Sequence, residues 1–559
     1  MNSQQMIKPI HAGALPISFA MARLAHIQET IDQRVQWRED NTKVSPGFLI
    51  ESLVAAIMST HGTIPLVRLQ EYWRDQDWEL LFRGTSITPD QLNDDAYGRA
   101  LDKLADLDLE QLCMDISVQL LLKHEEDIQV IHADTTSKSV QGVYDQPADD
   151  SFVLAHGYSK DHRPDLKQLK IGLGVQQKGL PLFAQVFSGN VSDQKWSIQA
   201  IQKMSQVFEE NGQRAPFVLD SSLITKDNLA AMEQKQIQFL SRIPDTFSVT
   251  ESAKEEAMRS TEWIAFQTPN EKEYRLYTTF GAPCAQRKTM YPLTVVWSKE
   301  LATKKEGTLQ KNWAKMQKKL MKELKKKEKT LFSCEADART ALDESIRAIY
   351  EQGFDVKGAV TSVKTLSHTG PGRPKKDRVA EEMTTYALSF SDLAIHPAFA
   401  ERERHMASCF VLISSPDMTH SAEEKLLLYK KQSRVETRFR LLKDPMVFDR
   451  VYLKNPTRVM ALSYVFYLVL LLLSYLEYRV RRSLAERQED WIAPGNKKTK
   501  TPSVKAIVET LDRLMTMAIG NDRYIAEPTR PQIHHAVEWA GFDLEILITP
   551  IIEMEQHIR

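Results

Sequence analysis

The sequence is poor in cysteine and carries almost no net charge. Four cysteines occur in 559 residues, and none stands at a spacing typical of a metal-binding pair: Cys113, Cys284, Cys334 and Cys409. Such scattered cysteines indicate a reducing intracellular compartment and argue against a structural zinc site. The formal net charge is −1, so a surface for an anionic partner must come from local clusters of Lys and Arg.

The sequence also lacks an N-terminal pattern of basic and then apolar residues, so we expect no signal peptide. One stretch, Val459 to Leu476, has no charged residue over 18 positions, which is the lower limit for a membrane span. Arg458 precedes this stretch and Glu477 follows it. We expect a buried core helix here and no membrane contact, with a membrane helix as the alternative.

The composition is that of a globular protein, with 42% hydrophobic and 26% charged residues. The length is too great for one hydrophobic core, so several domains are expected. We predict five regions. They are a helical N-terminal module (1–120), the first half of an α/β core (121–245), an α+β insertion (246–405), the second half of the core (406–484) and a C-terminal helical module (485–559).

Two acidic residues each end a short apolar β run: Asp134 in residues 127–136 and Asp220 in residues 215–220. Between them lie two β runs, residues 167–177 and 180–190, joined by a plausible turn at Lys178-Gly179. A helix is expected at about 194–210, and a helix and a fifth strand follow Asp220. The expected order is three antiparallel strands, a helix, a strand, a helix and a strand. This order predicts an RNase H-like mixed sheet.

The insertion contains a lysine-rich segment, Lys299 to Thr330, with twelve Lys, four Glu and no Arg. Apolar residues recur there at helical spacing, which predicts an amphipathic basic helix. A basic loop rich in Gly and Pro follows at residues 367–377. After the insertion, residues 407–415 are expected to form a core strand and residues 421–444 one helix carrying Glu436.

Three acids arriving in this structural order suggest a site for divalent metal ions. Mg²⁺ prefers oxygen ligands, and two ions can activate an attacking oxygen and stabilise a leaving one. A single acid at a strand end is more often a turn or cap residue, so the weight lies on Asp134, Asp220 and Glu436 together. Asp193 is a rival for the second acid, but N-capping of the following helix is its expected role.

At this point a family resemblance becomes specific. Tyr429, Glu436 and Lys443 stand at the spacing of the YREK signature, which is Tyr, two residues, Arg, three residues, Glu, six residues, Lys. With HADTTS around Asp134 and residues 157–175 and 188–244, the sequence resembles the insertion-sequence DDE transposases of the insertion-sequence-four superfamily. The Arg position of the signature holds Gln432, and the nearest arginine is Arg434.

The resemblance implies an enzyme that cuts double-stranded DNA at the terminal inverted repeats of an element and joins the freed 3′-OH ends to target DNA. It implies Mg²⁺ as cofactor, with Mn²⁺ able to substitute, a homodimer on DNA, and a prokaryotic cytoplasmic, nucleoid-associated location. Relatives often use a DNA hairpin with a flipped base stacked on an aromatic residue. Trp263, Trp297 and Trp313 are candidates for that role, and the N-terminal module is a candidate for binding the DNA ends.

Further residues are predicted to contact DNA. Lys160, His162 and Arg163 follow the first acid and could bind phosphates, and Arg373 and Lys375 stand in a GRPKK segment that resembles a minor-groove hook. The signature adds a third set on the helix of Glu436: Tyr429, Gln432, Arg434 and Lys443. The lysine-rich helix could follow the DNA backbone. Ordinary solvated surface charge remains the alternative for these basic groups.

Two other functions stay open. One is a transposase-derived DNA-binding protein that no longer cuts DNA. Gln432 in place of arginine is compatible with this alternative, whereas the presence of all three acids argues against it. The other is a metal-dependent nuclease without strand transfer.

Overall fold

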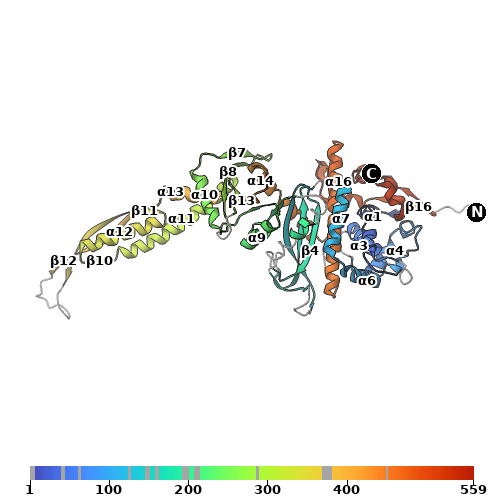
Figure 1. The fold of residues 1–559 in the computed structure, drawn as a ribbon, viewed down its shortest axis with the longest axis horizontal. Helices are drawn as coiled ribbons and strands as arrows, with labels where there is room; N and C mark the ends of the chain where they lie inside the picture. Colours follow the sequence, from blue (N-terminus) through green and yellow to red (C-terminus); the bar gives the residue numbers. More distant parts are fainter. Residues whose placement is uncertain are drawn as a thin grey trace, which may run out of the picture. The chain divides into compact units, whose positions relative to one another are not determined.

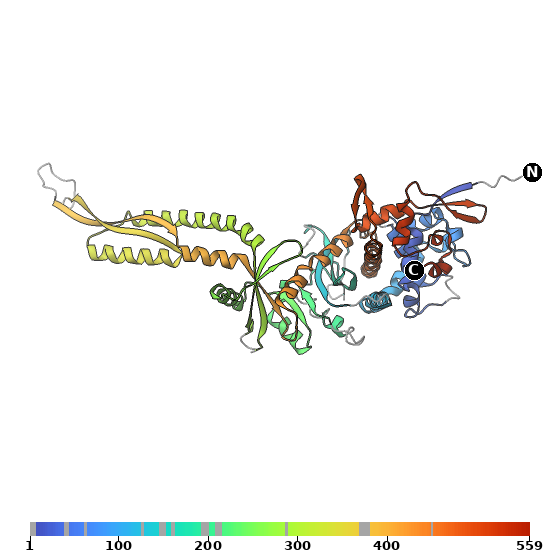
Figure 2. The same cartoon turned by 90° about the horizontal axis from the view of Figure 1, so that it is seen from above.

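The computed structural model is a mixed α/β structure made of two units (Figures 1 and 2). One unit comprises Met1–Ser241 and Leu428–Arg559, and the other Arg242–Leu427. The structure describes residues 7–38, 44–60, 64–123, 128–144, 152–157, 163–191, 201–206, 215–284, 289–367, 381–448 and 451–558. The first unit therefore joins segments from both ends of the chain.

A mixed sheet forms the core of the first unit. Its strands are β2 (Ile131–Val140), β3 (Lys167–Gln176), β4 (Pro181–Ser188), β5 (Phe217–Leu219) and β6 (Phe239–Arg242), in the order β4-β3-β2-β5-β6. β2, β3 and β4 pair antiparallel, while β5 runs parallel to β2 and β6 parallel to β5. This order and these directions are those of an RNase H-like sheet, so the predicted fold class is confirmed.

The turn between β3 and β4 falls at Lys178 and Gly179, as the sequence predicts. Gly179 has a φ of 86°, a left-handed conformation that residues with a Cβ rarely adopt. An added Cβ there would also lie 3.3 Å from the Arg438 guanidinium. The turn therefore requires glycine for both its backbone conformation and its close contact with Arg438.

The uncharged segment forms part of helix α16 (Pro456–Glu486), which is capped by Asn455 and starts with proline. Within its most apolar 18-residue window, 94% is buried inside the protein. The helix contacts β4 and the helices α3 (Pro46–Ser59), α6 (Asp94–Ala105) and α7 (Leu109–Lys123) (Figure 1). The predicted buried core helix is confirmed.

Polar groups on α16 bond to three of its neighbours, β4, α7 and α6. The Tyr464 hydroxyl accepts a hydrogen bond from the Val186 N–H of β4 at 3.1 Å. The Tyr467 hydroxyl lies 2.7 Å from the Ser117 hydroxyl of α7. Arg458 forms a two-point ion pair with Asp102 of α6, with N–O distances of 2.7 and 2.6 Å. The two tyrosine bonds satisfy polar groups inside a largely apolar interface, where an unpaired group would be costly.

The N-terminal region is mostly helical, as predicted. Besides α3, α6 and α7 it contains α1 (Leu15–Leu24), α2 (Ile27–Asp32), α4 (Leu69–Asp75), α5 (Trp78–Leu81) and the short strand β1 (Ile7–His11). Ser45 caps α3 by accepting a hydrogen bond from the Phe48 N–H at 3.1 Å. The last core helix after β5 is α9 (Lys226–Gln234), which Thr225 caps in the same way.

The C-terminal region is less purely helical than predicted. It contains α17 (Val504–Leu511) and α18 (Gln532–Trp539), but also β14 (Trp491–Ala493), β15 (Lys497–Thr499), β16 (Met515–Ile519) and β17 (Asp522–Ile525). β16 also pairs with β1. The missed signal is the dipeptide Gly520-Asn521 between β16 and β17, because a two-residue loop with glycine at positive φ is typical of a tight hairpin.

The second unit has an α+β structure. Its sheet has four antiparallel strands in the order β13-β9-β8-β7: β7 (Ile264–Gln267), β8 (Glu273–Gly281), β9 (Tyr291–Ser298) and β13 (Cys409–Ser414). The unit also contains helices α10 (Ser248–Arg259) and α13 (Pro397–Ser408). The remaining elements form an arm (residues 299–395; Figure 2): α11 (Lys299–Lys327), β10 (Leu331–Phe332), α12 (Glu335–Glu351), β11 (Phe354–Ser367) and β12 (Glu381–Ile395). The exact domain boundaries stay a prediction.

The helix predicted over residues 421–444 is instead two helices. α14 spans Ala422–Lys430 and α15 spans Ser433–Lys443. Between them, the N–H groups of Gln432 and Val435 bond to carbonyls three residues back, which is the tighter 3₁₀ pattern. No Gly or Pro marks this break, so the sequence gives no local sign of it. Tyr429 therefore lies on a different helix from Glu436, and the prediction that one helix carries both is wrong.

We predict that Leu471→Ala in α16 lowers the free energy of unfolding by roughly 2–5 kcal/mol, because it leaves a cavity in a fully buried interface. Urea denaturation measures this loss. Leu122→Ala, at a partly exposed site on α7 in the same unit, is the matched control and should cost far less. Equal losses in the two variants would contradict the burial of α16.

Candidate active site

Asp134 and Asp220 lie next to each other at the sheet. β2 and β5 run parallel, and Ala133 is the register partner of Leu219. Asp134 directly follows Ala133, and Asp220 directly follows Leu219. Their backbones are therefore separated by about one strand spacing, roughly 4.8 Å. The sheet therefore brings together two carboxylates that are far apart in sequence.

Each aspartate also has a local backbone contact. Asp134 Oδ1 accepts a hydrogen bond from the Thr135 N–H at 2.7 Å, and Asp220 Oδ1 accepts one from the Ser222 N–H at 2.8 Å. The second contact makes Asp220 the cap of a short 3₁₀ turn (Ser221–Leu223). Both side chains are half-buried. Capping and metal binding are compatible, because a carboxylate has two oxygens and several lone pairs.

Helix α15 brings Glu436 to the same part of the core. This helix packs against β2 and β3 through the buried side chains Val435, Arg438, Phe439 and Leu442. Glu436 follows Val435 by one residue, or about 100° around the helix, and its side chain is exposed. It thus stands beside the packed face, with Lys443 about two turns further on the same side.

His132 is a buried histidine on β2, close to the start of α15. It is fully buried on β2, two residues before Asp134, so both side chains point to one face. Burial, together with the positive charges of Arg434 and Lys431, lowers the pKa of His132 to about 4. Those charges belong to the start of α15 and the residues before it. The start of α15 therefore lies close enough to β2 to influence the residue two positions before Asp134.

The aspartate pair fits a hard divalent cation, since Mg²⁺ is usually held by one or two carboxylates together with substrate phosphates. The third acid is not part of that pair in this structure. Within the described residues, which include all three acids, no group of three His, Cys, Asp or Glu side chains could hold a metal ion. The structure thus pairs Asp134 with Asp220 and leaves Glu436 on the adjoining helix, exposed.

Sequence reasoning missed the residue that fixes α15. The Arg438 Nε donates a hydrogen bond of 2.5 Å to the Gly179 carbonyl in the β3–β4 turn. Its Nη1 lies 2.8 Å from Glu477 Oε2 on α16, and both side chains are 7% exposed. Glu477 also pairs with Arg481 at 2.6 Å. Arg438 therefore joins the helix of Glu436 to the sheet and to α16 at once.

No local signal could have identified Arg438. It stands among Arg434, Arg440 and Lys443 in a basic helix, and its partners lie 259 residues upstream and 39 residues downstream. Nothing in the local sequence predicts burial of Glu477 either, because it is the first charged residue after the apolar stretch. Only the tertiary structure distinguishes the buried arginine from its less buried neighbours.

The other predicted DNA contacts are spread over several places. Lys160, His162, Arg373 and Lys375 lie outside the described residues, as does Asp193. Arg163 is exposed and forms an ion pair with Asp165 at 2.7 Å.

The signature residues around Glu436 differ in their surroundings. Tyr429, Gln432 and Lys443 are half-buried. Burial, followed by the charge of Arg438, lowers the pKa of Arg434. Arg434 lies about 200° around α15 from Glu436, so it does not share the flank of the acid.

Each of the three candidate tryptophans has a neighbouring side chain against its ring. Trp263 donates a hydrogen bond to the Ala257 carbonyl at 2.9 Å and lies 5.9 Å from the Tyr277 ring. Arg275 covers Trp297 at 4.9 Å, and Arg404 covers the buried Trp313 at 5.0 Å. The choice of a base-stacking residue therefore stays open.

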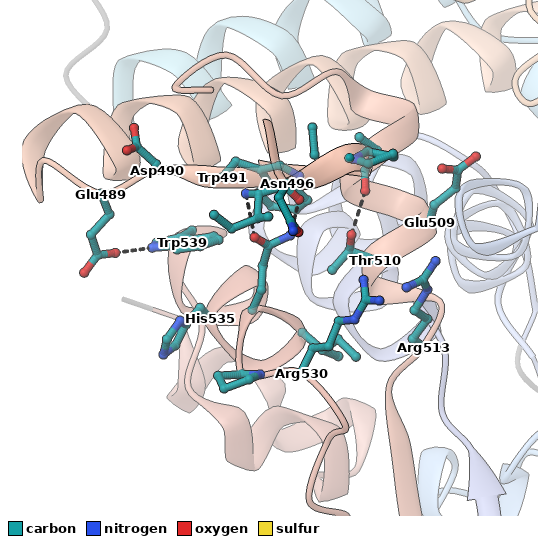
Figure 3. A pocket seen from close by; sticks show the side chains of 18 residues that line it. Glu489, Asp490, Trp491, Asn496, Glu509, Thr510, Arg513, Arg530, His535 and Trp539 are labelled. Carbon is teal, nitrogen blue, oxygen red and sulfur yellow. Dashed lines mark hydrogen bonds between the residues drawn. The ribbon is translucent and has the colours of Figure 1, made fainter. Parts of the chain in front are cut away.

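A separate hollow of about 960 Å³ lies in the C-terminal region (Figure 3). It is bordered by β14, α17 and α18, with Arg513 and Arg530 pointing into it and Trp491 and Trp539 forming part of its wall. The Trp539 indole donates a hydrogen bond to Glu489 at 2.5 Å. None of the three predicted acids lines this hollow, so it is not the predicted catalytic site.

We predict that Arg438→Met lowers the free energy of unfolding by up to about 3–5 kcal/mol, because it removes one partner of a buried charge pair. Urea denaturation is the measurement. Arg440→Met, on an exposed position of the same helix, should change stability by less than about 0.5 kcal/mol. Adding Glu477→Met to Arg438→Met should restore much of the loss. Similar behaviour of Arg438→Met and Arg440→Met would show that the network is unimportant.

Two family models match the chain. The model described as "Domain of unknown function (DUF4277)" matches residues 9–118, and the model described as "Transposase DDE domain" matches residues 144–472. The second match covers more than half of the chain and includes Asp220 and Glu436, while Asp134 lies ten residues before its start. A comparison with curated proteins finds no match.

Solved structures give weaker similarities. A piggyBac transposase synaptic complex with hairpin DNA is 10% identical, with 91% of this chain and 82% of that chain covered and a TM-score of 0.36. A Mos1 transposase paired-end complex with the left transposon end is 11% identical, with 32% and 60% covered and a TM-score of 0.14. These TM-scores are too low to establish a shared fold. The assignment therefore rests on the family match, by which this chain belongs to the Transposase DDE domain family.

Proposed function

We propose that this protein is the transposase of an insertion sequence of the YREK group. It cuts double-stranded DNA at the terminal inverted repeats of its element and joins the 3′-OH ends to target DNA. The observation that carries the proposal is the adjacency of Asp134 and Asp220 across parallel strands, in a chain of the DDE family. The spacing of Glu436 and Lys443 along α15 supports the YREK assignment.

In this proposal Asp134, Asp220 and Glu436 hold Mg²⁺, which Mn²⁺ can replace. When bound, the metal ions activate the attacking oxygen and stabilise the leaving oxygen of an in-line displacement. Asp134 and Asp220 are oriented by the sheet and by their backbone hydrogen bonds. Glu436 is exposed on a helix that Arg438 fixes against the sheet, and in this proposal it completes the site when the metal ions and DNA bind.

The remaining signature residues would act on the DNA. Lys443, on the same side of α15 as Glu436, supplies a positive charge for a phosphate. Gln432 can donate a hydrogen bond to a phosphate but adds no charge, so binding there would be weaker than with arginine. We also propose a homodimer that holds two DNA ends in the cytoplasm, at the nucleoid.

A DNA-binding protein without cleavage activity is the second candidate function. The specific observation that favours it is the position of Glu436 outside a three-acid cluster, together with Gln432 in place of arginine. The two functions differ in one measurable result, which is whether the protein cuts an element end in the presence of Mg²⁺.

We predict that Asp134→Asn, Asp220→Asn and Glu436→Gln each lower cleavage of an inverted-repeat duplex by at least about 10³-fold, since each removes a charged metal ligand. That loss corresponds to about 4 kcal/mol in the barrier. Binding of the same duplex in EDTA should persist. The measurement is single-turnover cleavage with Mg²⁺, followed by gel analysis of joined products.

Asp343→Asn and Glu344→Gln, at exposed positions of α12, are the matched controls and should cut at the wild-type rate. Binding without cutting by the wild-type protein would favour the DNA-binding function. Cutting without joined products would favour a nuclease. Cutting by all three acid variants would refute the proposed site.

A further inference from the structure

One face of α11 carries a continuous row of lysines. At 100° per residue, eight lysines fall within an arc of about 120°. We call this row the lysine stripe: Lys304, Lys311, Lys315, Lys318, Lys319, Lys322, Lys325 and Lys326. All eight are exposed. From Lys304 to Lys326 the stripe is about 33 Å long at 1.5 Å per residue.

The opposite face of α11 packs mainly against the rest of the arm. Leu320 and Leu324 belong to a hydrophobic cluster with Ile349, Phe354 and Leu393, and Trp313 is buried under Arg404 at 5.0 Å. Gln317 Nε2 donates a hydrogen bond to the Leu393 carbonyl at 2.5 Å. Packing between Trp313 and Leu324 therefore holds the opposite face of α11, and with it the lysine stripe, toward solvent.

The charges of the stripe are not neutralised within the part of the chain that the structure describes. The ion pairs of α11 there involve other residues: Lys299 with Glu273, Glu300 with Lys272 and Glu306 with Arg404. A helix stabilised by its own surface charges would place Glu four residues from Lys. Glu300 and Glu323 do stand four residues from Lys304 and Lys319, but eight like charges still share one face, which costs repulsion energy in the free protein.

We propose that the lysine stripe binds the phosphate backbone of duplex DNA without regard to sequence. Lysine is suited to this, because it is a point charge on a flexible stem, whereas arginine has the planar fork that reads base edges and pairs bidentately. The length of the stripe matches about one turn of duplex, roughly 34 Å. The proposal rests on the proposed function for its DNA partner, and adds a binding surface remote in sequence from the acids.

The test is the salt dependence of binding. We compare the wild-type full chain with a variant carrying Lys311→Gln, Lys315→Gln, Lys318→Gln and Lys322→Gln. The probe is a fluorescent duplex of about 40 base pairs, longer than one helical turn, without an inverted repeat and in EDTA. Glutamine is a good helix former, so α11 should persist, and circular dichroism verifies this.

Each phosphate neutralised by a lysine contributes about 0.9 to the slope of log K against log salt concentration. The quadruple variant should therefore lose about 3.6 from the slope and bind at least roughly 100-fold more weakly at 0.1 M salt. Replacing the same four lysines by arginine should retain most of the affinity and slope. A second duplex of unrelated sequence should give the same losses.

The matched control removes four charges elsewhere, by changing the exposed Lys497, Lys498, Lys500 and Lys505 to Gln. The proposal is overturned if this control loses as much slope as the stripe variant, or if the stripe variant keeps the wild-type slope. It is also overturned if the loss appears with only one of the two duplexes. Because no cleavage is measured, failure of the acid site would leave this result unchanged.

Discussion

The parallel pairing of β2 with β5 is the constraint on which the site depends. A parallel pair sets both strands in the same direction, so residues that follow matched positions lie side by side at one edge of the sheet. Ala133 and Leu219 are such matched positions, and they place Asp134 beside Asp220. A shift of one residue on either strand would turn one aspartate to the other face. The register therefore determines whether two carboxylates can share a ligand.

Glu436 depends on a different kind of contact. Its helix is fixed by a buried arginine that bonds to the β3–β4 turn and to α16. The helix α16 in turn bonds to α6, α7 and β4 through Arg458, Tyr467 and Tyr464. The long apolar helix thus connects the N-terminal helices to the sheet, and the position of the third acid is set through it. Burial of Arg438 is tolerable only because Glu477 and the Gly179 carbonyl satisfy its donors.

The sequence predicted the core strands well where the spacing of apolar residues and the turn-forming residues at their ends indicate the same structure. The two β runs around Lys178-Gly179 and the acid-ending run before Asp220 formed strands because their alternation and bounding residues point to one structure. The break between α14 and α15 was missed because no Gly or Pro marks it, and its 3₁₀ bonds are apparent only in the structure. Arg438 was missed because burial of one arginine among several is a tertiary property. The strands β16 and β17 were missed although Gly520-Asn521 marked their turn.

The most direct test of the shared site is anomalous diffraction from crystals of the full chain grown with Mn²⁺ and an element-end duplex. The account predicts a manganese ion bound directly by oxygens of both Asp134 and Asp220, with Glu436 at the same centre. Manganese bound to only one of the two aspartates, or held by other residues, would contradict it.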